Sequence, residues 1–327
     1  MTNGRAEGAA AGPRLAVLGA GEVGCGWAAL AAAHGRAVAM HDSDGSALAR
    51  AAPVVRARVD ALVAHSLADR AAARTGLDAL STHTGLEEAV AAADWVIEAA
   101  PESLGAKQEL LARAETILEA VARGPVLASS SSGLHASALA ERLRHPDRLL
   151  VVHPLVPVEL IPIVEVIPGP LTAPEVIEVV RAELFALGRT PIVLRKEVSG
   201  NAVGRIAAAV WRESIDLVLD GVLDAADLDR LVAEGPGLGW ASGGPHLTYE
   251  LAAGDAGMAG FLDHLLPTFE AWWAALSERT TLEPGERGRL ASLVAAAYDE
   301  PRAELRRGRD ERLISLVKAL SEAGARH

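Results

Sequence analysis

A histidine and a glutamate twelve residues apart are the side chains of this sequence best suited to proton transfer. His153 follows the apolar run Leu149–Val152 and precedes a proline, so it lies where the chain leaves a predicted strand. Glu165 lies inside the apolar run IPIVEVI, where an unpaired carboxylate would be costly. If the two strands are neighbours, Glu165 can orient the imidazole while its other nitrogen takes a proton from a substrate hydroxyl. The alternative is a structural histidine and an edge-strand glutamate, and spacing alone favours neither.

A run of four serines, Ser129–Ser132, follows a short apolar strand predicted over Pro125–Ser129. Hydroxyl groups at the end of a strand can hold a substrate oxygen by hydrogen bonds. The run is equally typical of a polar loop between a strand and a helix, in which one serine caps the helix that follows. From the residues alone, the second interpretation is favoured.

Oxidation of a hydroxyl also needs a hydride acceptor, and the stretch Arg14–Asp44 predicts a dinucleotide site. An apolar strand leads into a G-x-G-x-x-G motif, and an alanine-rich helix, a second apolar strand and an aspartate follow. The first glycine permits a sharp turn, the second lets the backbone approach a pyrophosphate, and the third lets the helix pack closely. The N–H groups at the start of the helix then bind the phosphates. The residues predicted to bind the cofactor here are Gly19, Gly21, Glu22, Val23, Gly24 and Asp42.

The cofactor is predicted to be NAD and not NADP. Asp42 lies 18 residues past Gly24, at a strand end where its carboxylate can accept hydrogen bonds from an adenosine ribose. Ser43 and Asp44 follow, with no arginine beside them that could hold a 2′-phosphate. An ordinary glycine-rich loop would not bring strand, helix, second strand and acid in this order.

Two charged residues follow another buried strand, near the place where a nicotinamide would lie. Glu102 and Lys107 come after the apolar segment Asp94–Ala99. Taken singly, both are typical of surface charges. The nine histidines other than His153 lack the spacing of metal ligands, so no metal site is predicted.

The alternation of strands and helices predicts an α/β domain with a Rossmann-like, doubly wound and mainly parallel sheet. Strand patterns disappear towards residue 198, and helical patterns dominate from there. We therefore expect a loose tail at 1–13, an NAD-binding domain at 14–195 and an all-α domain at 196–327. Five glycines in Gly235–Gly244 predict a loop between helices of the second domain. The helices expected there are Val203–Leu219, Ala225–Glu234, Leu247–Ala253, Gly260–Ser277, Pro284–Tyr298 and Asp310–Ala323.

Composition argues against several other classes of protein. The 327 residues suffice for two domains, and the single cysteine, Cys25, excludes an intrachain disulfide and fits a reducing compartment. A net charge of −12 argues against broad attraction to nucleic acid or an anionic membrane. No apolar run is long enough to span a bilayer, and the N-terminus lacks the apolar stretch of a secretory signal. We predict a cytoplasmic protein in which Cys25 is a small packing residue and not a nucleophile.

Taken together, the motifs resemble those of the 3-hydroxyacyl-CoA dehydrogenase superfamily, from Arg14 to at least Trp273. The segments that carry the resemblance are GAGEVGCGW, ADWVIEAAPESLGAKQEL, SSSSGL, and HP followed by VEV at the family's spacing. Within the superfamily, three further segments are most similar to the carnitine dehydrogenases and the related lambda-crystallin and gulonate 3-dehydrogenase group. These segments are WRESIDLVLDGV, GPGLGWASGGPHLTYELAAGDAGM and RDERL.

The resemblance implies roles for particular residues. His153 and Glu165 match the family's catalytic dyad, and Ser132 matches the contact to the substrate hydroxyl. Glu102 and Lys107 match positions that line the cofactor. The family also implies a homodimer built through the helical domain.

Two positions depart from the family's pattern. The family commonly has an asparagine three residues after the catalytic histidine, where this chain has Val156. The first helix of the second domain usually carries Asn or Asp just before an arginine. Here Gly204 precedes Arg205, and Asn201 lies three residues earlier. Both departures are consistent with a specialised metabolite as substrate in place of carnitine.

We therefore predict an NAD-dependent dehydrogenase that oxidises the hydroxyl of a small 3-hydroxy acid to a ketone, or catalyses the reverse. One alternative is a 3-hydroxyacyl-CoA dehydrogenase, which would need a basic patch for the CoA phosphates. Another is a crystallin-like homologue that binds NAD without useful catalysis. A carnitine-like betaine would need an aromatic face for its quaternary ammonium. The residues that could form such a face, or instead lie in a core or interface, are Trp240, Tyr249, Trp272 and Trp273.

Overall fold

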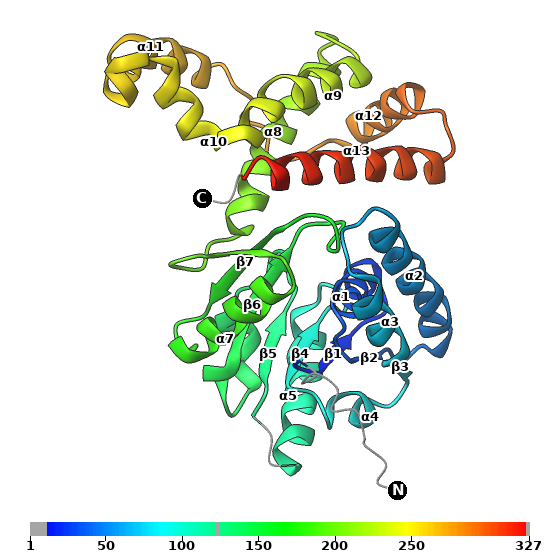
Figure 1. Ribbon diagram of the computed structural model, residues 1–327. Helices are drawn as coiled ribbons and strands as arrows, with labels where there is room; N and C mark the ends of the chain where they lie inside the picture. The colour runs from blue at the N-terminus through cyan, green and yellow to red at the C-terminus, as the bar shows by residue number, and fades with distance from the viewer. Residues whose placement is uncertain (1–11, 122–123, 325–327) are drawn as a thin grey trace, which may run out of the picture. The chain divides into compact units, whose positions relative to one another are not determined.

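The computed structural model describes residues 12–121 and 124–324. The chain divides into two units, with the boundary between Gly204 and Arg205. In the first unit, the described residues form one sheet with the strand order β3-β2-β1-β4-β5-β6-β7-β8 (Figure 1). The strands are β1 (Leu15–Leu18), β2 (Val38–His41), β3 (Leu80–His83), β4 (Trp95–Glu98), β5 (Val126–Ser129), β6 (Leu149–Pro154), β7 (Ile163–Pro168) and β8 (Thr190–Val193).

Neighbouring strands of this sheet are parallel, except where β6 meets β7. From β1 the chain first adds β2 and β3 on one side, and it then adds β4, β5 and β6 on the other. The sheet is therefore doubly wound and mainly parallel, and the prediction of a Rossmann-like fold is confirmed. Its strand order reverses between β1 and β4, and such sheets bind ligands beyond the carboxyl ends of the strands at that place.

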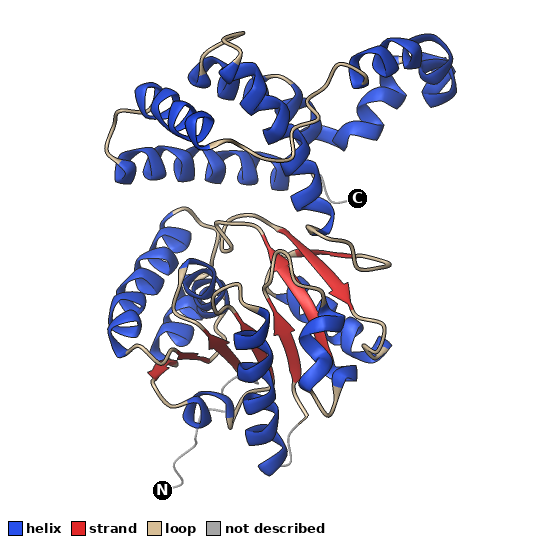
Figure 2. Cartoon of the chain, turned by 180° about the vertical axis from the view of Figure 1, so that it is seen from behind, coloured by secondary structure: helices blue, strands red, loops and turns tan. Residues whose placement is uncertain are grey.

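Helices cover both faces of the sheet (Figure 2). Ala16 and Leu18 of β1 point to the face covered by α4 and α5, whereas Val17 lies against Gly24 of α1 on the other face. Strands buried on both faces explain why the sequence shows continuous apolar runs and no alternation. The helices of this unit are α1 (Glu22–Ala33), α2 (Gly45–Ala64), α3 (Arg70–Asp78), α4 (Leu86–Val90), α5 (Leu104–Ala120), α6 (Ala136–Leu139) and α7 (Pro174–Ala186).

Helix α1 is buried because its small side chains let neighbouring elements come close. All its residues from Gly24 to Ala33 are buried, and both α2 and α3 pack against it. A β-carbon on Gly76 of α3 would lie 2.0 Å from the carbonyl oxygen of Ala32, so a glycine is needed at this approach. The alanine-rich sequence thus builds a dense core with few aromatic side chains.

The second unit is helical in its described residues, as predicted. A small core joins three of its helices, where Val218, Ala225 and Leu228 pack with Leu290 and Leu293. In the part of the chain that the structure describes, no helix has the length and apolar character needed to cross a bilayer. The helices are α8 (Asn201–Leu219, which begins in the first unit), α9 (Ala225–Glu234), α10 (Pro236–Ala252), α11 (Gly257–Trp273), α12 (Pro284–Ala297) and α13 (Arg302–Glu322).

Helix α10 corrects one expectation from the sequence. The glycines of Gly235–Gly244 predict a loop, but the chain is helical from Pro236. Proline suits the first position of a helix, where its missing N–H needs no partner. Each glycine costs only about 1 kcal/mol relative to alanine, which packing in a domain can overcome. Only at Gly244, with a φ of +75° before Pro245, is the helix interrupted by a kink.

Replacement of Gly24 by alanine is expected to destabilise the first unit, because the new β-carbon would lie 2.0 Å from the carbonyl oxygen of Gly19. Overpacking of this kind costs about 1–3 kcal/mol. Gly105 is the matched control, since it also lies in the first turn of a helix and a β-carbon there would meet nothing within 4 Å. Thermal unfolding followed by circular dichroism should give a lower Tm for Gly24→Ala, and an unchanged or higher Tm for Gly105→Ala. Equal Tm values for the two variants would contradict the close packing of α1.

Candidate active site

His153 and Glu165 lie opposite each other on the antiparallel strands β6 and β7. The sequence left open whether these strands are neighbours, and the structure places the two side chains in contact. The His153 Nδ1 atom lies 2.8 Å from Glu165 Oε2. The imidazole is 11% exposed and the carboxylate only 2%, so the pair is shielded from bulk water. The glutamate that looked costly inside an apolar strand thus has its partner.

The second carboxylate oxygen of Glu165 binds the N-terminus of helix α8. Glu165 Oε1 accepts hydrogen bonds from the backbone N–H groups of Ala202 at 2.9 Å and Val203 at 3.0 Å. Helix N-termini carry partial positive charge and unpaired N–H groups, so they stabilise a carboxylate. Glu165 is therefore held by three donors from two different elements, and it can act only as an acceptor.

This arrangement fixes which ring nitrogen of His153 carries the proton. Because the ionised carboxylate can only accept, Nδ1 must donate, and the neutral ring leaves Nε2 as an acceptor. Nε2 lies 3.1 Å from the hydroxyl oxygen of Ser132, whose side chain comes from the loop after β5. An imidazole with a defined tautomer and the hydroxyl of an exposed serine therefore lie together at the carboxyl end of the sheet.

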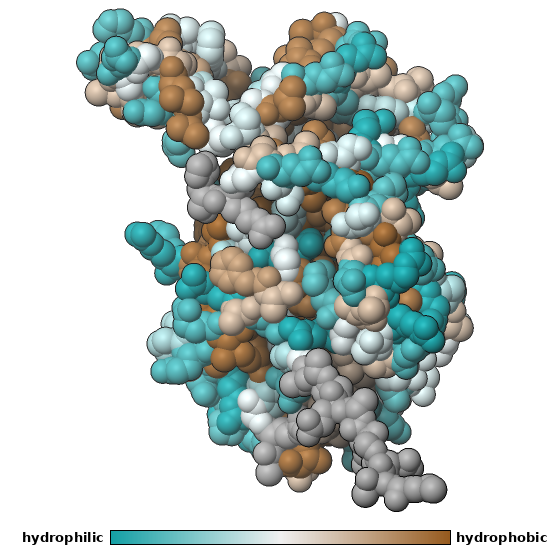
Figure 3. All heavy atoms as spheres, in the orientation of Figure 1, coloured by the Kyte–Doolittle hydropathy of each residue, from teal (hydrophilic) through white to brown (hydrophobic). Residues whose placement is uncertain are grey.

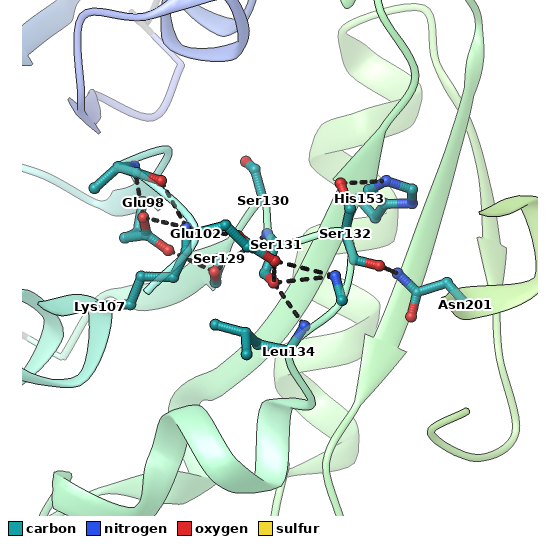
Figure 4. A network of polar contacts seen from close by, with 12 residues as sticks. Glu98, Glu102, Lys107, Ser129, Ser130, Ser131, Ser132, Leu134, His153 and Asn201 are labelled. Carbon is teal, nitrogen blue, oxygen red and sulfur yellow. Dashed lines mark hydrogen bonds and ion pairs between the residues drawn. The ribbon is translucent and has the colours of Figure 1, made fainter. Parts of the chain in front are cut away.

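The four serines that end β5 and begin the loop after it each contact a different part of the first unit. Figure 4 shows the surroundings of Ser129, Ser131 and Ser132. The interpretation favoured by the residues alone is a polar loop between strand and helix in which one serine caps the helix. Residues 130–135 do form such a loop, but the expected serine cap is wrong. Helix α6 begins at Ala136, and none of the four serines caps it. Its first-turn N–H at Ser137 is bound instead by Glu197 Oε1 at 2.8 Å. The partners are Glu98 Oε2, which accepts from Ser129 at 2.5 Å; Trp27 Nε1, which donates to Ser130 at 2.9 Å; Glu102 Oε1, which accepts from Ser131; and His153 Nε2, beside Ser132 at 3.1 Å.

Below this loop lies a buried ion pair that sequence reasoning missed. The ammonium of Lys107 lies 2.7 Å from Glu98 Oε1, 2.9 Å from the carbonyl oxygen of Ala100 and 3.4 Å from Glu102 Oε2. Its three protons therefore all have acceptors within the chain. The side chains of Glu98 and Lys107 are 0% and 2% exposed, so Lys107 is not the surface charge that it resembles when taken singly. The acidic residue inside the apolar segment Asp94–Ala99 was the available signal, by the same reasoning that identified Glu165.

Glu102 connects this ion pair to the serine loop. Partial burial alone would raise the pKa of its carboxyl group. Hydrogen bonds from the Ser131 hydroxyl and the Gly133 N–H, together with the charge of Lys107, outweigh burial and lower the pKa below its usual value. Glu102 is thus held ionised at the edge of the site, with its side chain 47% exposed.

The glycine-rich turn has the shape that a dinucleotide requires. A β-carbon on Gly19, whose φ is +121°, would lie 2.5 Å from the carbonyl oxygen of Ala99, whereas one on Gly21 would meet nothing within 4 Å. No side chain of the described residues caps the first turn of α1 at Gly21. The start of α1 therefore offers open space and uncapped N–H groups where a pyrophosphate would bind.

The remaining candidates of the cofactor segment lie around this turn. Asp42 accepts hydrogen bonds from Ala20 N–H at 3.0 Å and Asp44 N–H at 2.9 Å, so its carboxylate ties the end of β2 to the turn. Val23 is partly buried, and the exposed Glu22 forms an ion pair with Arg58 of α2 at 2.6 Å. The ion pair offsets a negative charge close to the expected phosphates.

The positions that depart from the family's pattern lie as follows. Val156 is 44% exposed, and a β-carbon on Gly204 would meet nothing within 4 Å. Asn201 is 6% exposed, and its amide donates to the carbonyl oxygen of Ser132 at 3.3 Å. Asn201 therefore braces the serine loop from the start of α8. Within the described residues, no group of three or more potential metal ligands is found.

Comparisons with known proteins identify the family of this chain. Residues 14–198 match the family model of the 3-hydroxyacyl-CoA dehydrogenase NAD binding domain. An L-carnitine dehydrogenase of Pseudomonas sp is 37% identical over 313 residues, which cover 96% of this chain and 95% of that protein. One of Streptomyces griseus is 38% identical over 312 residues, which cover 94% and 89%. The solved structure of 5-formyl-3-hydroxy-2-methylpyridine 4-carboxylic acid 5-dehydrogenase, an NAD+-dependent dismutase, has a TM-score of 0.80 at 27% identity and covers 96% of this chain and 99% of its own.

Cys25 is expected to be inert in the folded protein. Its thiol is 5% exposed, and burial raises its pKa above the usual value of 9.0 in spite of the nearby Arg58. Because the thiolate is the reactive form, a disulfide-exchange reagent at pH 8 should label native protein far more slowly than protein unfolded in urea. The unfolded chain loses the thiol proton first, so this contribution to stability is complete below pH 9.0 and is lost as the pH rises further.

Cys25→Ala should keep dehydrogenase turnover and show a smaller loss of stability above pH 9.0. Rapid labelling of the native thiol, or loss of turnover in a well-folded variant, would instead give Cys25 a chemical role.

Proposed function

Because the chain belongs to the 3-hydroxyacyl-CoA dehydrogenase family, it is an NAD-dependent oxidoreductase of a 3-hydroxy substrate, and we propose that His153, Glu165 and Ser132 perform its proton transfer. One observation carries this proposal: the 2.8 Å contact of Glu165 with His153 Nδ1 leaves His153 Nε2 free to accept, 3.1 Å from Ser132. The three residues thus supply an orienting carboxylate, a base and a hydroxyl donor.

The proposed reaction removes a proton and a hydride from the same alcohol. NAD, when bound, supplies the hydride acceptor. His153 Nε2 takes the proton of the substrate hydroxyl, and Glu165 stabilises the imidazolium that results. Ser132 holds the substrate oxygen by a hydrogen bond, because this residue is exposed and its hydroxyl already reaches the same nitrogen. The carbon–oxygen bond becomes a carbonyl, and the reverse sequence reduces a ketone.

The proposed cofactor contacts divide between the two ends of the dinucleotide. The turn at α1 holds the pyrophosphate, and Asp42 accepts hydrogen bonds from the adenosine ribose. Glu102 lies on the nicotinamide side, where Lys107 holds it from below at 3.4 Å. The residues assigned to the turn are Gly19, Gly21, Glu22, Val23 and Gly24.

The substrate that we propose is a small free 3-hydroxy acid, either carnitine or a specialised analogue. The relatives named L-carnitine dehydrogenase match almost the whole chain, which supports the free-acid class. An exposed apolar side chain at Val156 and open space at Gly204 support an analogue with less polar substituents than carnitine.

Turnover of this class of substrate should depend on His153. NADH formation would be measured with NAD and L-carnitine, L-gulonate, 3-hydroxybutyrate or a 3-hydroxyacyl-CoA, at mildly alkaline pH. His153→Ala should lower kcat by about 10²–10⁴-fold, the usual contribution of general-base catalysis, and leave the Kd for NADH unchanged. The half-exposed His145 gives the matched control His145→Ala, which should keep full activity.

Each other outcome of this panel has a definite meaning. Turnover of the CoA thioester alone would replace the free-acid class by the 3-hydroxyacyl-CoA dehydrogenase alternative. Tight NADH binding without turnover of any substrate in the panel would favour a substrate analogue that the panel lacks, or the crystallin-like alternative. Full turnover by His153→Ala would refute the assignment of the base.

We further propose that the protein is a homodimer built through its helical unit. On the face drawn in Figure 3, apolar surface lies open on the helices of the second unit. A groove of about 680 Å³, lined by apolar residues of α8, α9 and α12, opens on the same unit. A second copy is the occupant that the family implies.

Tyr249, Phe269 and the tryptophans at 272 and 273 form an aromatic cluster, which supports an interface role in place of a cation-binding face. In the second unit, the large apolar side chains exposed by more than half are Ile206, Trp211, Val222, Leu231, Leu238, Leu251, Trp272 and Trp273.

Trp211→Asp should convert the dimer to a monomer, because Trp211 lines the groove and is 64% exposed in the single chain. Phe185→Asp is the matched control, since this side chain is 55% exposed but lies in the first unit. Sedimentation velocity would measure the molar mass in solution. A monomeric wild type, or a dimer that survives Trp211→Asp, would contradict this interface.

A cytoplasmic location is also part of the proposal. It is supported by Cys25, a buried free thiol, since reducing compartments keep such thiols unpaired.

A further inference from the structure

One hydrogen bond joins the cofactor helix α1 directly to the serine loop. Trp27 Nε1 donates to the hydroxyl of Ser130 at 2.9 Å, and the two side chains belong to residues 103 positions apart. Trp27 is 0% exposed and lies three residues beyond Gly24 in α1, while Ser130 lies two residues before Ser132. In the sheet, β4 lies between the strand that precedes α1 and the strand that precedes the loop. The bond therefore spans the place where the strand order reverses.

The other three serine hydroxyls do not reach α1. Their partners are Glu98 at the end of β4, Glu102 in the turn after it, and His153 on β6. The backbone N–H of Ser130 itself donates to the carbonyl oxygen of Glu98 at 2.8 Å. Both the backbone and the side chain of Ser130 are therefore held by hydrogen bonds. A shift of the indole would thus move the backbone that presents Ser132.

Burial alone does not account for this bond, because the chain leaves a second buried indole without one. Trp95 packs edge-on against Trp27, with ring centroids 6.3 Å apart, and is 3% exposed. Among the described residues, its Nε1 has no hydrogen-bond partner. A neighbouring, similarly buried site thus tolerates an unpaired indole N–H, which distinguishes the paired Trp27 from a side chain that only fills space.

We propose that Trp27 is a positioning residue that acts through Ser130 to set the distance between the dinucleotide on α1 and the substrate oxygen held by Ser132 and His153. The inference rests on the proposed function, because it takes Ser132 and His153 as the residues around that oxygen. Hydride transfer is sensitive to placement, and a displacement of about 1 Å can lower the rate about 10²-fold. A direct bond from the cofactor helix to the substrate loop holds that distance without a contact to either ligand.

The two indoles allow a matched test. Trp27→Phe removes the donor and keeps an aromatic ring, and Trp95→Phe removes an N–H that has no acceptor. Trp27→Phe should lower kcat at least about tenfold while the Kd for NADH stays within about twofold. Trp95→Phe should leave both unchanged. Ser130→Ala should lower kcat as much as Trp27→Phe does, and the double variant should be no slower than either single variant. Ser130→Thr keeps a hydroxyl and should have the kcat of the wild type.

A second readout uses the protein without cofactor. The ring nitrogen signals of His153, followed by NMR across a pH titration, report the hydrogen bond from Ser132. They should shift in Trp27→Phe and Ser130→Ala and stay in place in Trp95→Phe. Unchanged kcat and unchanged His153 signals in Trp27→Phe, with or without a lower Tm, would overturn the positioning role. Turnover that survives His153→Ala would instead refute the proposed function, so the two failures are distinguishable.

Discussion

The chemistry that we propose for this protein depends on how the hydrogen bonds of one carboxylate, that of Glu165, are satisfied. It is 2% exposed, so it has left nearly all of its water and must recover those hydrogen bonds from the chain. One oxygen takes the imidazole of His153, and the other takes two N–H groups of α8. The only antiparallel pairing in the described sheet, β6 with β7, puts the two side chains opposite each other. The orientation of the proposed base and the start of α8 are therefore set by the same group.

The same principle is used a second time in the layer beneath the serine loop. Glu98 ends β4 and is fully buried, and it is matched by the ammonium of Lys107, a serine hydroxyl and a backbone N–H. Removing one partner from such a group strands a charge in a dry environment, which costs several times more than the pair contributes. Two satisfied carboxylates thus make the carboxyl end of the sheet rigid where precision is needed. The first turn of α1, where we propose that the cofactor binds, stays open and uncapped instead.

The sequence was sufficient for the features that follow from local pattern. Continuous apolar runs separated by helical segments predict the doubly wound sheet, and the spacing of Gly19, Gly21 and Gly24 predicts the turn at α1. A glutamate inside an apolar strand predicts a partner, and the same reasoning applied to Glu98 would have revealed the buried Lys107. The kinked helix α10 could not be foreseen, because propensity disfavours its glycines and only packing in the domain decides. The Trp27–Ser130 bond joins residues 103 positions apart, and no periodicity carries that information.

The serine run has a consequence for how sequences of this kind are compared. It is a run of one residue type, and the residues of such runs are commonly treated as interchangeable, so that the run can lengthen or shorten. Here the serines are not interchangeable, because four consecutive hydroxyls contact four different partners. Deleting one serine would still leave a run of serines, but each hydroxyl after the deletion would face the partner of its neighbour. In this loop, the position of a gap in an alignment carries more information than the identity of the residues beside it.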